Sequence, residues 1–205
     1  MSFINIIEGL HEIHITVDSR DLFALRMYCM DTKTKPILAI SEYGNHPIQA
    51  MLSKYKNGKA LEIICLAKEM ANQMSQKYNI RVLRVKVESM MHNEGVPVLE
   101  NDEKDDQFYF EFHLKVSVEN SDNWQKISNI CKTDIAHLSF NAAKKETIPL
   151  ITLRLPVSLG SNKAVKLKDD LLHLLRINNI LVFDGIQSEF SVFDSNIELD
   201  KGWLS

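Results

Sequence analysis

A six-residue pattern occurs twice in the chain, and this repeat constrains the fold more than any other feature. Glu12–Val17 reads EIHITV, and Glu111–Val116, which starts 99 residues later, reads EFHLKV. Each copy is followed by a stretch with helical spacing, two apolar runs, a longer helical stretch and a last alternating run. That last run follows Asn79-Ile80 in the first half and Asn179-Ile180 in the second. The repeat predicts two copies of one structural unit.

The order of these patterns in each half is βαββαβ, which is typical of a ferredoxin-like unit. The expected strands of the first half are 12–17, 35–41, 48–55 and 81–89, and those of the second half are 108–118, 135–140, 149–155 and 181–193. We therefore expect an α+β fold, a tandem repeat of two ferredoxin-like βαββαβ units packed around a shared polar cleft. The expected organisation is a first unit at 1–92, an acidic linker or loop at 93–106, and a second unit at 107–205 that includes a C-terminal extension.

Composition excludes several functional classes. The formal net charge of the 205 residues is −3, so no global basic field favours a nucleic acid duplex. No apolar run approaches the ~20 residues that a membrane-spanning helix needs. The first ten residues lack the features of a secretory signal, and the three cysteines have no CxxC spacing. We expect a cytoplasmic protein whose partner is a small molecule and which has no membrane partner.

Strand alternation places chemically versatile side chains on one face of each predicted sheet. The polar face of the first half comprises Glu12, His14, Thr16, Arg84, Lys86 and Glu88, and that of the second comprises Glu111, His113, Lys115, His137, Ser139, Thr152 and Arg154. A solvated sheet face is the ordinary alternative. Histidine, lysine, arginine and glutamate are less usual there than threonine or serine, and buried charges are costly unless they are paired or used. The pattern favours a functional cleft between the two halves.

One chemistry open to this set is metal binding. Matching strands of the two halves supply His14, Glu88, His113 and Glu189, a donor set suited to a divalent transition metal. The segment His14–Val17, followed by Asp21-Leu22 and Tyr28, resembles the vicinal-oxygen-chelate (glyoxalase-type) superfamily. That resemblance implies a metal-dependent glyoxalase-like enzyme with a His/Glu site.

A second chemistry is phosphate-ester cleavage. The segments His14-Ile15-Thr16 and His137-Leu138-Ser139 both fit His-x-[Ser/Thr]. This pair resembles the motifs of the two-histidine phosphoesterases. The resemblance implies that each histidine acts as acid or base and that the hydroxyl groups hold phosphate oxygens.

A third reading involves no catalysis. Four cations would make the cleft attract anions, namely Arg84, Lys86, Lys115 and Arg154. The chain would then bind an anion or nucleotide without changing it.

We expect a small-molecule enzyme, a phosphoesterase-like hydrolase, that acts on an anionic substrate, phosphorylated substrates included, by histidine acid–base chemistry. This reading is preferred to the metal reading because lysine and arginine suit phosphate oxygens and repel a divalent cation. The expected catalytic residues are His14, His113 and His137. The expected substrate-binding residues are Thr16, Lys86, Lys115, Ser139 and Arg154, and Glu88 and Glu111 would orient an imidazole. No cofactor is expected under this reading. The alternative divalent metal would use His14, Glu88, His113 and Glu189.

Overall fold

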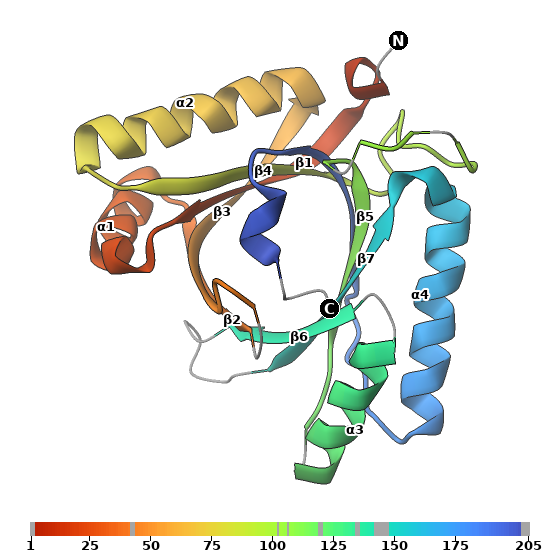
Figure 1. The fold of residues 1–205 in the computed structure, drawn as a ribbon. Coiled ribbons are helices and arrows are strands. Elements are labelled where there is room, and N and C mark those ends of the chain that lie inside the picture. The colour runs from red at the N-terminus through yellow and green to blue at the C-terminus, as the bar shows by residue number, and fades with distance from the viewer. Residues whose placement is uncertain are drawn as a thin grey trace.

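In the part of the chain that the structure describes, eight antiparallel strands close into one barrel, with four α-helices on its outer surface (Figure 1). The computed structural model describes residues 3–41, 44–101, 103–105, 107–118, 121–133, 136–141 and 148–201. The elements of the first half are β1 (Glu8–Val17), α1 (Leu22–Thr32), β2 (Lys35–Ser41), β3 (Ile48–Lys59), α2 (Ala60–Tyr78) and β4 (Val82–Met90). Those of the second half are β5 (Tyr109–Lys115), α3 (Ser121–Thr133), β6 (Ala136–Asn141), β7 (Pro149–Pro156), α4 (Gly160–Ile177) and β8 (Gln187–Asp194). Short 3-10 turns are η1 (Phe3–Asn5), η2 (Ser19–Asp21), η3 (Val157–Leu159) and η4 (Ile197–Asp200).

The strand order around the barrel is β1-β3-β2-β6-β7-β5-β8-β4. Each half therefore contributes four neighbouring strands, in the order β4-β1-β3-β2 and β8-β5-β7-β6. Two seams join the halves. At one, Ser41 of β2 is opposite Ser139 of β6, and at the other, Lys86 of β4 is opposite Asp194 of β8. The lumen-facing side chains of both halves consequently share one enclosed space.

Alternation along the strands separates the apolar core from the lumen. Ile13, Ile15 and Val87 are fully buried on the outer face of the barrel wall, where α2 contacts β1 and β4. In the second half Phe112 and Leu114 are fully buried on the corresponding face, and α4 contacts β5. Figure 1 shows α1 and α2 over the first-half strands and α3 and α4 over the second-half strands. The apolar core thus lies between barrel and helices, and the alternate side chains point inward.

The repeated Asn-Ile pair has a physical explanation. Asn79 ends α2 in the left-handed conformation, with φ of 53°, and Asn179 follows α4 with φ of 59°. Asparagine tolerates this region better than most residues, which makes it a common helix terminator. The next residues, Ile80 and Ile180, are each 2% exposed, and their amides donate back to carbonyls of the preceding helix. The pair therefore stops each long helix and anchors the chain before it turns toward the last strand.

Several element boundaries differ from the sequence expectation: β1 already begins at Glu8, β5 ends at Lys115, and β3 and β8 show the larger differences. Strand β3 continues through Asn57 and Gly58 to Lys59 instead of ending at a turn, because this part still pairs with Glu8, Gly9 and Leu10 of β1. The last strand begins only at Gln187, not near 181. Before it, Val182 makes one isolated bridge to Val116, and Gly185 adopts φ of 85°.

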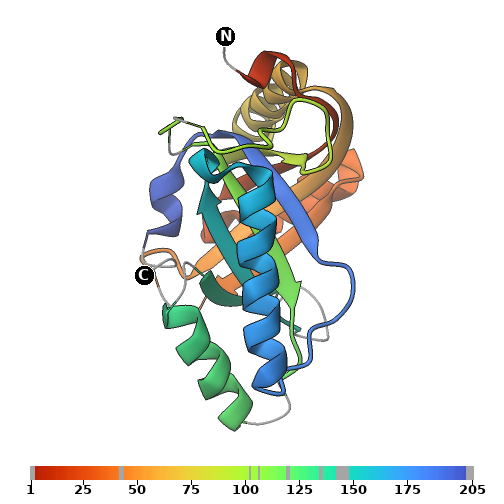
Figure 2. The ribbon, with the colours of Figure 1, turned by 90° about the vertical axis from the view of Figure 1, so that its right-hand side faces the viewer.

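The two segments outside the repeat lie against the barrel. In the segment between the halves, Pro97 accepts a hydrogen bond from the Ser161 amide and Asn101 donates one to Ser158, both at 2.9 Å. Beyond β8, the short helix η4 lies within the ring of strands in Figure 1 and to one side of it in Figure 2, so it covers one mouth of the barrel. None of the helices in the described ranges is long and apolar enough to cross a membrane.

Candidate functional site

The barrel encloses a cavity of about 300 Å³. Its polar lining comes from all eight of the described strands and from η4. It comprises Glu12, His14, Thr16, Lys35, Gln49, Tyr55, Arg84, Lys86, Glu88, Glu111, His113, Lys115, Ser139, Thr152, Arg154, Gln187 and Asp200. Apolar side chains such as Ile37, Met51 and Leu150 complete the wall. The cavity combines acids, bases and cations in a space of small-molecule size.

His14 lies between two carboxylates. Its Nε2 is 3.5 Å from Glu12 Oε1 and 3.3 Å from Glu88 Oε2. Its Nδ1 is buried and has no hydrogen-bond partner among the described residues. Burial opposes the ionisation of Glu12, but the nearby His14 charge and hydrogen bonds from Ser53 and Tyr55 outweigh it and lower the pKa of Glu12 to about 2. The His14 imidazole is therefore held beside a carboxylate that stays ionised.

His113 has the equivalent environment in the second half. Its Nε2 is 3.5 Å from Glu111 Oε1 and 3.6 Å from Glu189 Oε2, and its Nδ1 is 2.8 Å from Thr152 Oγ1. Burial lowers the pKa of His113 below 6.5, against the opposing charge of Glu111. The imidazole is therefore neutral at neutral pH, and the Thr152 hydroxyl fixes the orientation of its ring.

Three carboxylates, those of Glu12, Glu88 and Glu189, lie close to one another beside the histidines. Gln187 Nε2 donates to Glu189 Oε1 at 2.8 Å and also to Glu12 Oε2. Glu189 is fully buried, and burial, followed by the charges of Glu88 and Glu12, raises its pKa well above the usual value. The pKa of Glu189 is thus shifted upward and that of Glu12 downward, so Glu189 holds a proton more readily than Glu12 does.

Two of the expected anion-binding cations are already paired. Lys86 Nζ is 2.7 Å from Glu88 Oε1 and 2.9 Å from Glu111 Oε2. Arg154 Nη2 is 3.2 Å from Glu111 Oε2 and 2.6 Å from Asp200 Oδ2. Both side chains are therefore largely neutralised by carboxylates of the barrel, and they attract a further anion less than an unpaired cation would.

A second polar cluster closes the mouth that η4 covers. Arg84 Nε donates to Asp194 Oδ1 at 2.8 Å, and Arg84 Nη1 donates to Asp200 Oδ2 at 2.9 Å. Tyr109 Oη donates to Asp194 Oδ2 at 2.7 Å. The Arg154 guanidinium stacks 4.2 Å from the centre of the Tyr109 ring.

Two cavity-lining cations are unpaired within the part of the chain that the structure describes. Lys35 at the start of β2 and Lys115 at the end of β5 are exposed and have no ion pair with a described residue. Unpaired, solvated ammonium groups at the rim of a cavity attract anions over a Debye length of about 8 to 10 Å.

Most of the residues singled out from the sequence line this one cavity. They are His14, His113, Thr16, Lys86, Lys115, Ser139, Arg154, Glu88 and Glu111. The backbone of His137 pairs with Thr152 in the barrel wall, and its side chain lies outside the described residues. Glu189 is buried beside His113 and does not line the cavity.

Several polar residues of the lumen were not singled out from the sequence. Three of them, Lys35, Gln49 and Tyr55, lie on strands that were predicted from apolar runs. The fourth, Gln187, begins a strand that was expected to start earlier. Period-two counting along 48–55 places Gln49, Met51, Ser53 and Tyr55 on one face, a signal that could have found them. Asp200 has no counterpart in the first half, so the repeat gives no signal for it.

Within the described ranges, no group of three or more His, Cys, Asp or Glu side chains is placed to hold a metal ion. The set His14, Glu88, His113 and Glu189 is divided between the two halves. Each histidine lies between a carboxylate of its own strand and one of a neighbouring strand.

Comparison with known proteins adds no family. No protein-family model matches the chain, and no curated protein matches it. A function is therefore inferred from the residues that line the lumen.

Proposed function

We propose that this chain is an enzyme that acts on a small anionic molecule, phosphorylated molecules included, by histidine acid–base chemistry inside the barrel. The observation that carries the proposal is the matched environment of His14 and His113. Each imidazole lines the same cavity, and each has its Nε2 within 3.6 Å of two carboxylate oxygens. A carboxylate beside one imidazole nitrogen fixes the tautomer and makes the other nitrogen a better base.

In this proposal His14 exchanges the proton with the substrate. Its Nε2 faces Glu12 and Glu88, and its Nδ1 is the nitrogen that has no partner among the described residues. Nδ1 is buried in the structure, so in this proposal the imidazole turns to bring it to the cavity when a substrate binds. With a proton on Nε2, Nδ1 then accepts a proton from a substrate hydroxyl or an attacking water and returns it to a leaving group. The ionised Glu12 stabilises the imidazolium that forms in between.

His113 has the supporting role. Both of its nitrogens already have neighbours, with Thr152 at Nδ1 and Glu111 and Glu189 at Nε2. A neutral, oriented imidazole suits hydrogen bonding to a substrate oxygen better than repeated proton transfer. Thr16 and Ser139 add hydroxyl groups to the lining, and in this proposal they bind oxygens of the same molecule.

The charge distribution supports entry at the mouth opposite η4. Lys35 and Lys115 are the unpaired lining cations of the described chain, whereas Lys86 and Arg154 are paired to carboxylates. An anion attracted to the lysines would reach the histidines without breaking a buried ion pair, which would cost several kcal/mol.

The architecture of the barrel can be described more finely. We infer two ferredoxin-like βαββαβ units joined at both sheet edges, because each half has the element order and the strand order of such a unit. Joining the units at both edges puts their open sheet faces inside one barrel, where equivalent histidines share a cavity.

The test is turnover of a panel of phosphate monoesters and diesters by the whole chain, with His14→Gln as the decisive variant. We expect His14→Gln to lower kcat by about 10²- to 10⁴-fold while substrate affinity stays within about three-fold, because general acid–base catalysis contributes on that order. His92→Gln, at an exposed histidine outside the cavity, is the control. Ester binding without turnover by the unmodified chain would refute catalysis and leave a non-catalytic anion-binding protein.

A further inference from the structure

The carboxylate of Asp200 occupies a cradle of three donors that come from three different strands. Arg84 Nη1 of β4 donates to Oδ2 at 2.9 Å, and Arg154 Nη2 of β7 donates to the same oxygen at 2.6 Å. Gln49 Nε2 of β3 donates to Oδ1 at 3.0 Å. Asp200 is 5% exposed and lines the cavity. Proteins bind oxyanions with this kind of arrangement, in which two guanidinium groups and an amide converge on one group.

The donors belong to the barrel wall, whereas Asp200 belongs to a short turn added after the last strand. Helix η4 has four residues and covers one mouth of the barrel (Figures 1 and 2). Besides Asp200, three contacts among the described residues hold η4 on the barrel. The side chain of Leu199 is buried, the Asn196 side-chain amide donates to the Leu83 carbonyl at 3.1 Å, and the Lys201 carbonyl accepts from the Asn45 amide at 3.1 Å. If an oxyanion replaces Asp200 on the two guanidinium groups, those ion pairs are exchanged and not lost. Moving η4 then breaks only the remaining contacts, which are fewer than those of a barrel strand.

The cradle is held in place by contacts that do not involve Asp200. Arg84 keeps Asp194 as a partner and donates to Tyr109 Oη at 3.1 Å. Arg154 keeps Glu111 and its stack on the Tyr109 ring. Removing Asp200 would therefore leave preoriented donors, and Arg154 would lose its shortest ion pair. Buried donors without acceptors are costly, so an incoming oxyanion would be favoured there.

We propose that Asp200 is a built-in occupant of an oxyanion-binding site, and that the phosphate or carboxylate group of a small ligand takes its place when η4 moves away. The inference rests on the proposed function in one respect, that the lumen is the binding site of an anionic molecule. It adds a specific site, formed by Arg84, Arg154 and Gln49, and a competing group carried by the chain itself. A ligand can then bind only the molecules in which Asp200 has left the site. The larger the fraction in which Asp200 occupies the site, the weaker is the apparent affinity for the ligand.

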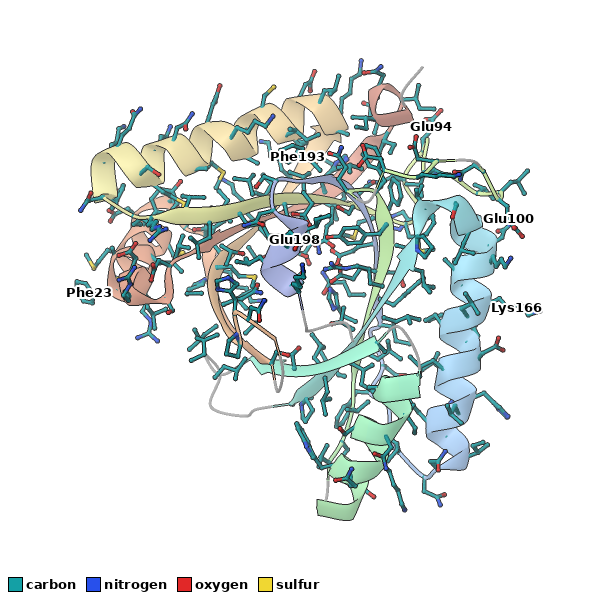
Figure 3. The ribbon with its side chains drawn as sticks, viewed as in Figure 1. Phe23, Glu94, Glu100, Lys166, Phe193 and Glu198 are labelled. Carbon is teal, nitrogen blue, oxygen red and sulfur yellow. The ribbon has the colours of Figure 1, made fainter. Side chains whose placement is uncertain are left out.

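The experiment compares the binding of inorganic phosphate and of malonate by isothermal titration calorimetry to the unmodified chain, Asp200→Asn and Glu198→Gln. Glu198 is the matched control, because it lies on the same turn (Figure 3) and its one ion pair with a described residue is to exposed Lys201, at 3.0 Å. We expect Asp200→Asn to bind phosphate, malonate or both about ten-fold or more tightly, because the competing carboxylate is gone. Glu198→Gln is expected to bind as the unmodified chain does. Adding Arg154→Gln to Asp200→Asn is expected to abolish the gain. The anion that gains more identifies the ligand group as phosphate or carboxylate.

A folded Asp200→Asn variant that binds both anions no better than the unmodified chain would overturn the inference. If Asp200→Asn does not fold, Leu199→Ala replaces it, since this change keeps every charge and only loosens the seat of η4. Leu199→Ala is then expected to tighten anion binding in the same direction, and an unchanged affinity would overturn the inference. Tighter phosphate binding by the variant, with no ester turned over by the unmodified chain, would support the oxyanion site and refute the proposed enzyme. Ester turnover by the unmodified chain, with no tighter anion binding by the variant, would support the proposed enzyme and overturn the oxyanion site.

Discussion

Lys86 Nζ of β4 lies 2.9 Å from Glu111 Oε2 of β5, so a buried cation of the first half is neutralised by a carboxylate of the second half. The pattern extends to Arg84, which pairs with Asp194 and Asp200. Strand β4 thus supplies cations to the lumen, and the second half supplies many of the acids that balance them. The halves are therefore joined through the lumen as well as along the two seams of the barrel.

Lys86→Met should destabilise the fold strongly. The change leaves Glu111 and Glu88 buried without their closest cation, and breaking a buried ion pair in this way costs about 3 to 5 kcal/mol. Urea denaturation followed by circular dichroism measures the loss. Lys163→Met is the control, because the Lys163 pair with Glu100 is exposed, and such pairs contribute at most about 1 kcal/mol. Equal losses in the two variants would contradict the inter-half role of Lys86.

The local parts of this fold could be predicted from the sequence. Alternation identified the inward set Glu12, His14 and Thr16, because side-chain direction in a strand depends only on position parity. The repeated Asn79 and Asn179 marked the ends of the long helices for an equally local reason. Closure of the barrel was not predictable, because the pairing of Ser41 with Ser139 carries no periodic signal in either segment.

The same limit applies to the candidate site. Alternation in the sequence assigned Lys86 and Arg154 to the polar set. It did not predict that both would pair with Glu111, because those distances depend on how the barrel closes. Asp200 was missed because it lies outside the repeat, and a lone aspartate in a C-terminal stretch is typical of a solvated segment. Its burial follows only from the position of η4 over the barrel mouth.

His11 should make the fold lose stability on mild acidification. It is fully buried, and desolvation lowers its pKa below 6.5, more than the hydrogen bond to the Gly9 carbonyl raises it. The unfolded chain therefore binds this proton more readily than the folded chain, so the contribution of His11 is present above pH 6.5 and is lost as the pH falls below it. In His11→Leu, the free energy of unfolding should depend less on pH between pH 7.5 and about 5 than it does in the unmodified chain. His173→Leu, at an exposed position of α4, controls for removal of an imidazole. An unchanged slope for His11→Leu would contradict the argument.

The two carboxylates that flank His113 should respond to amidation in opposite directions. Burial and the neighbouring Glu88 and Glu12 raise the pKa of Glu189, so its contribution to stability falls as the pH rises above 4.5. Burial opposes ionisation of Glu111, but Lys86 and Arg154 outweigh it and lower the pKa, so its contribution is present above pH 4.5. At pH 8, Glu189→Gln should therefore raise Tm and Glu111→Gln should lower it, by roughly 2 to 4 °C for each kcal/mol. Differential scanning calorimetry at pH 8 and pH 5 is the measurement. A Glu189→Gln variant less stable than the unmodified chain at pH 8 would show that Glu189 is ionised and paired.

Lys115→Glu should weaken capture of an anionic substrate without disturbing the chemistry. Lys115 lines the cavity, is exposed and has no ion pair with a described residue, so the fold loses little when its charge is reversed. The variant should raise KM about 5- to 20-fold at low ionic strength with kcat nearly unchanged, and the difference should shrink as salt screens the rim. Lys166→Glu makes the same charge change on the outer face of α4, away from the cavity (Figure 3). Steady-state kinetics at 20 and 500 mM salt, or phosphate titration if no ester is turned over, separates the two variants. An equal effect of both would assign the attraction to net charge alone, and no effect of either would place anion entry elsewhere in the barrel.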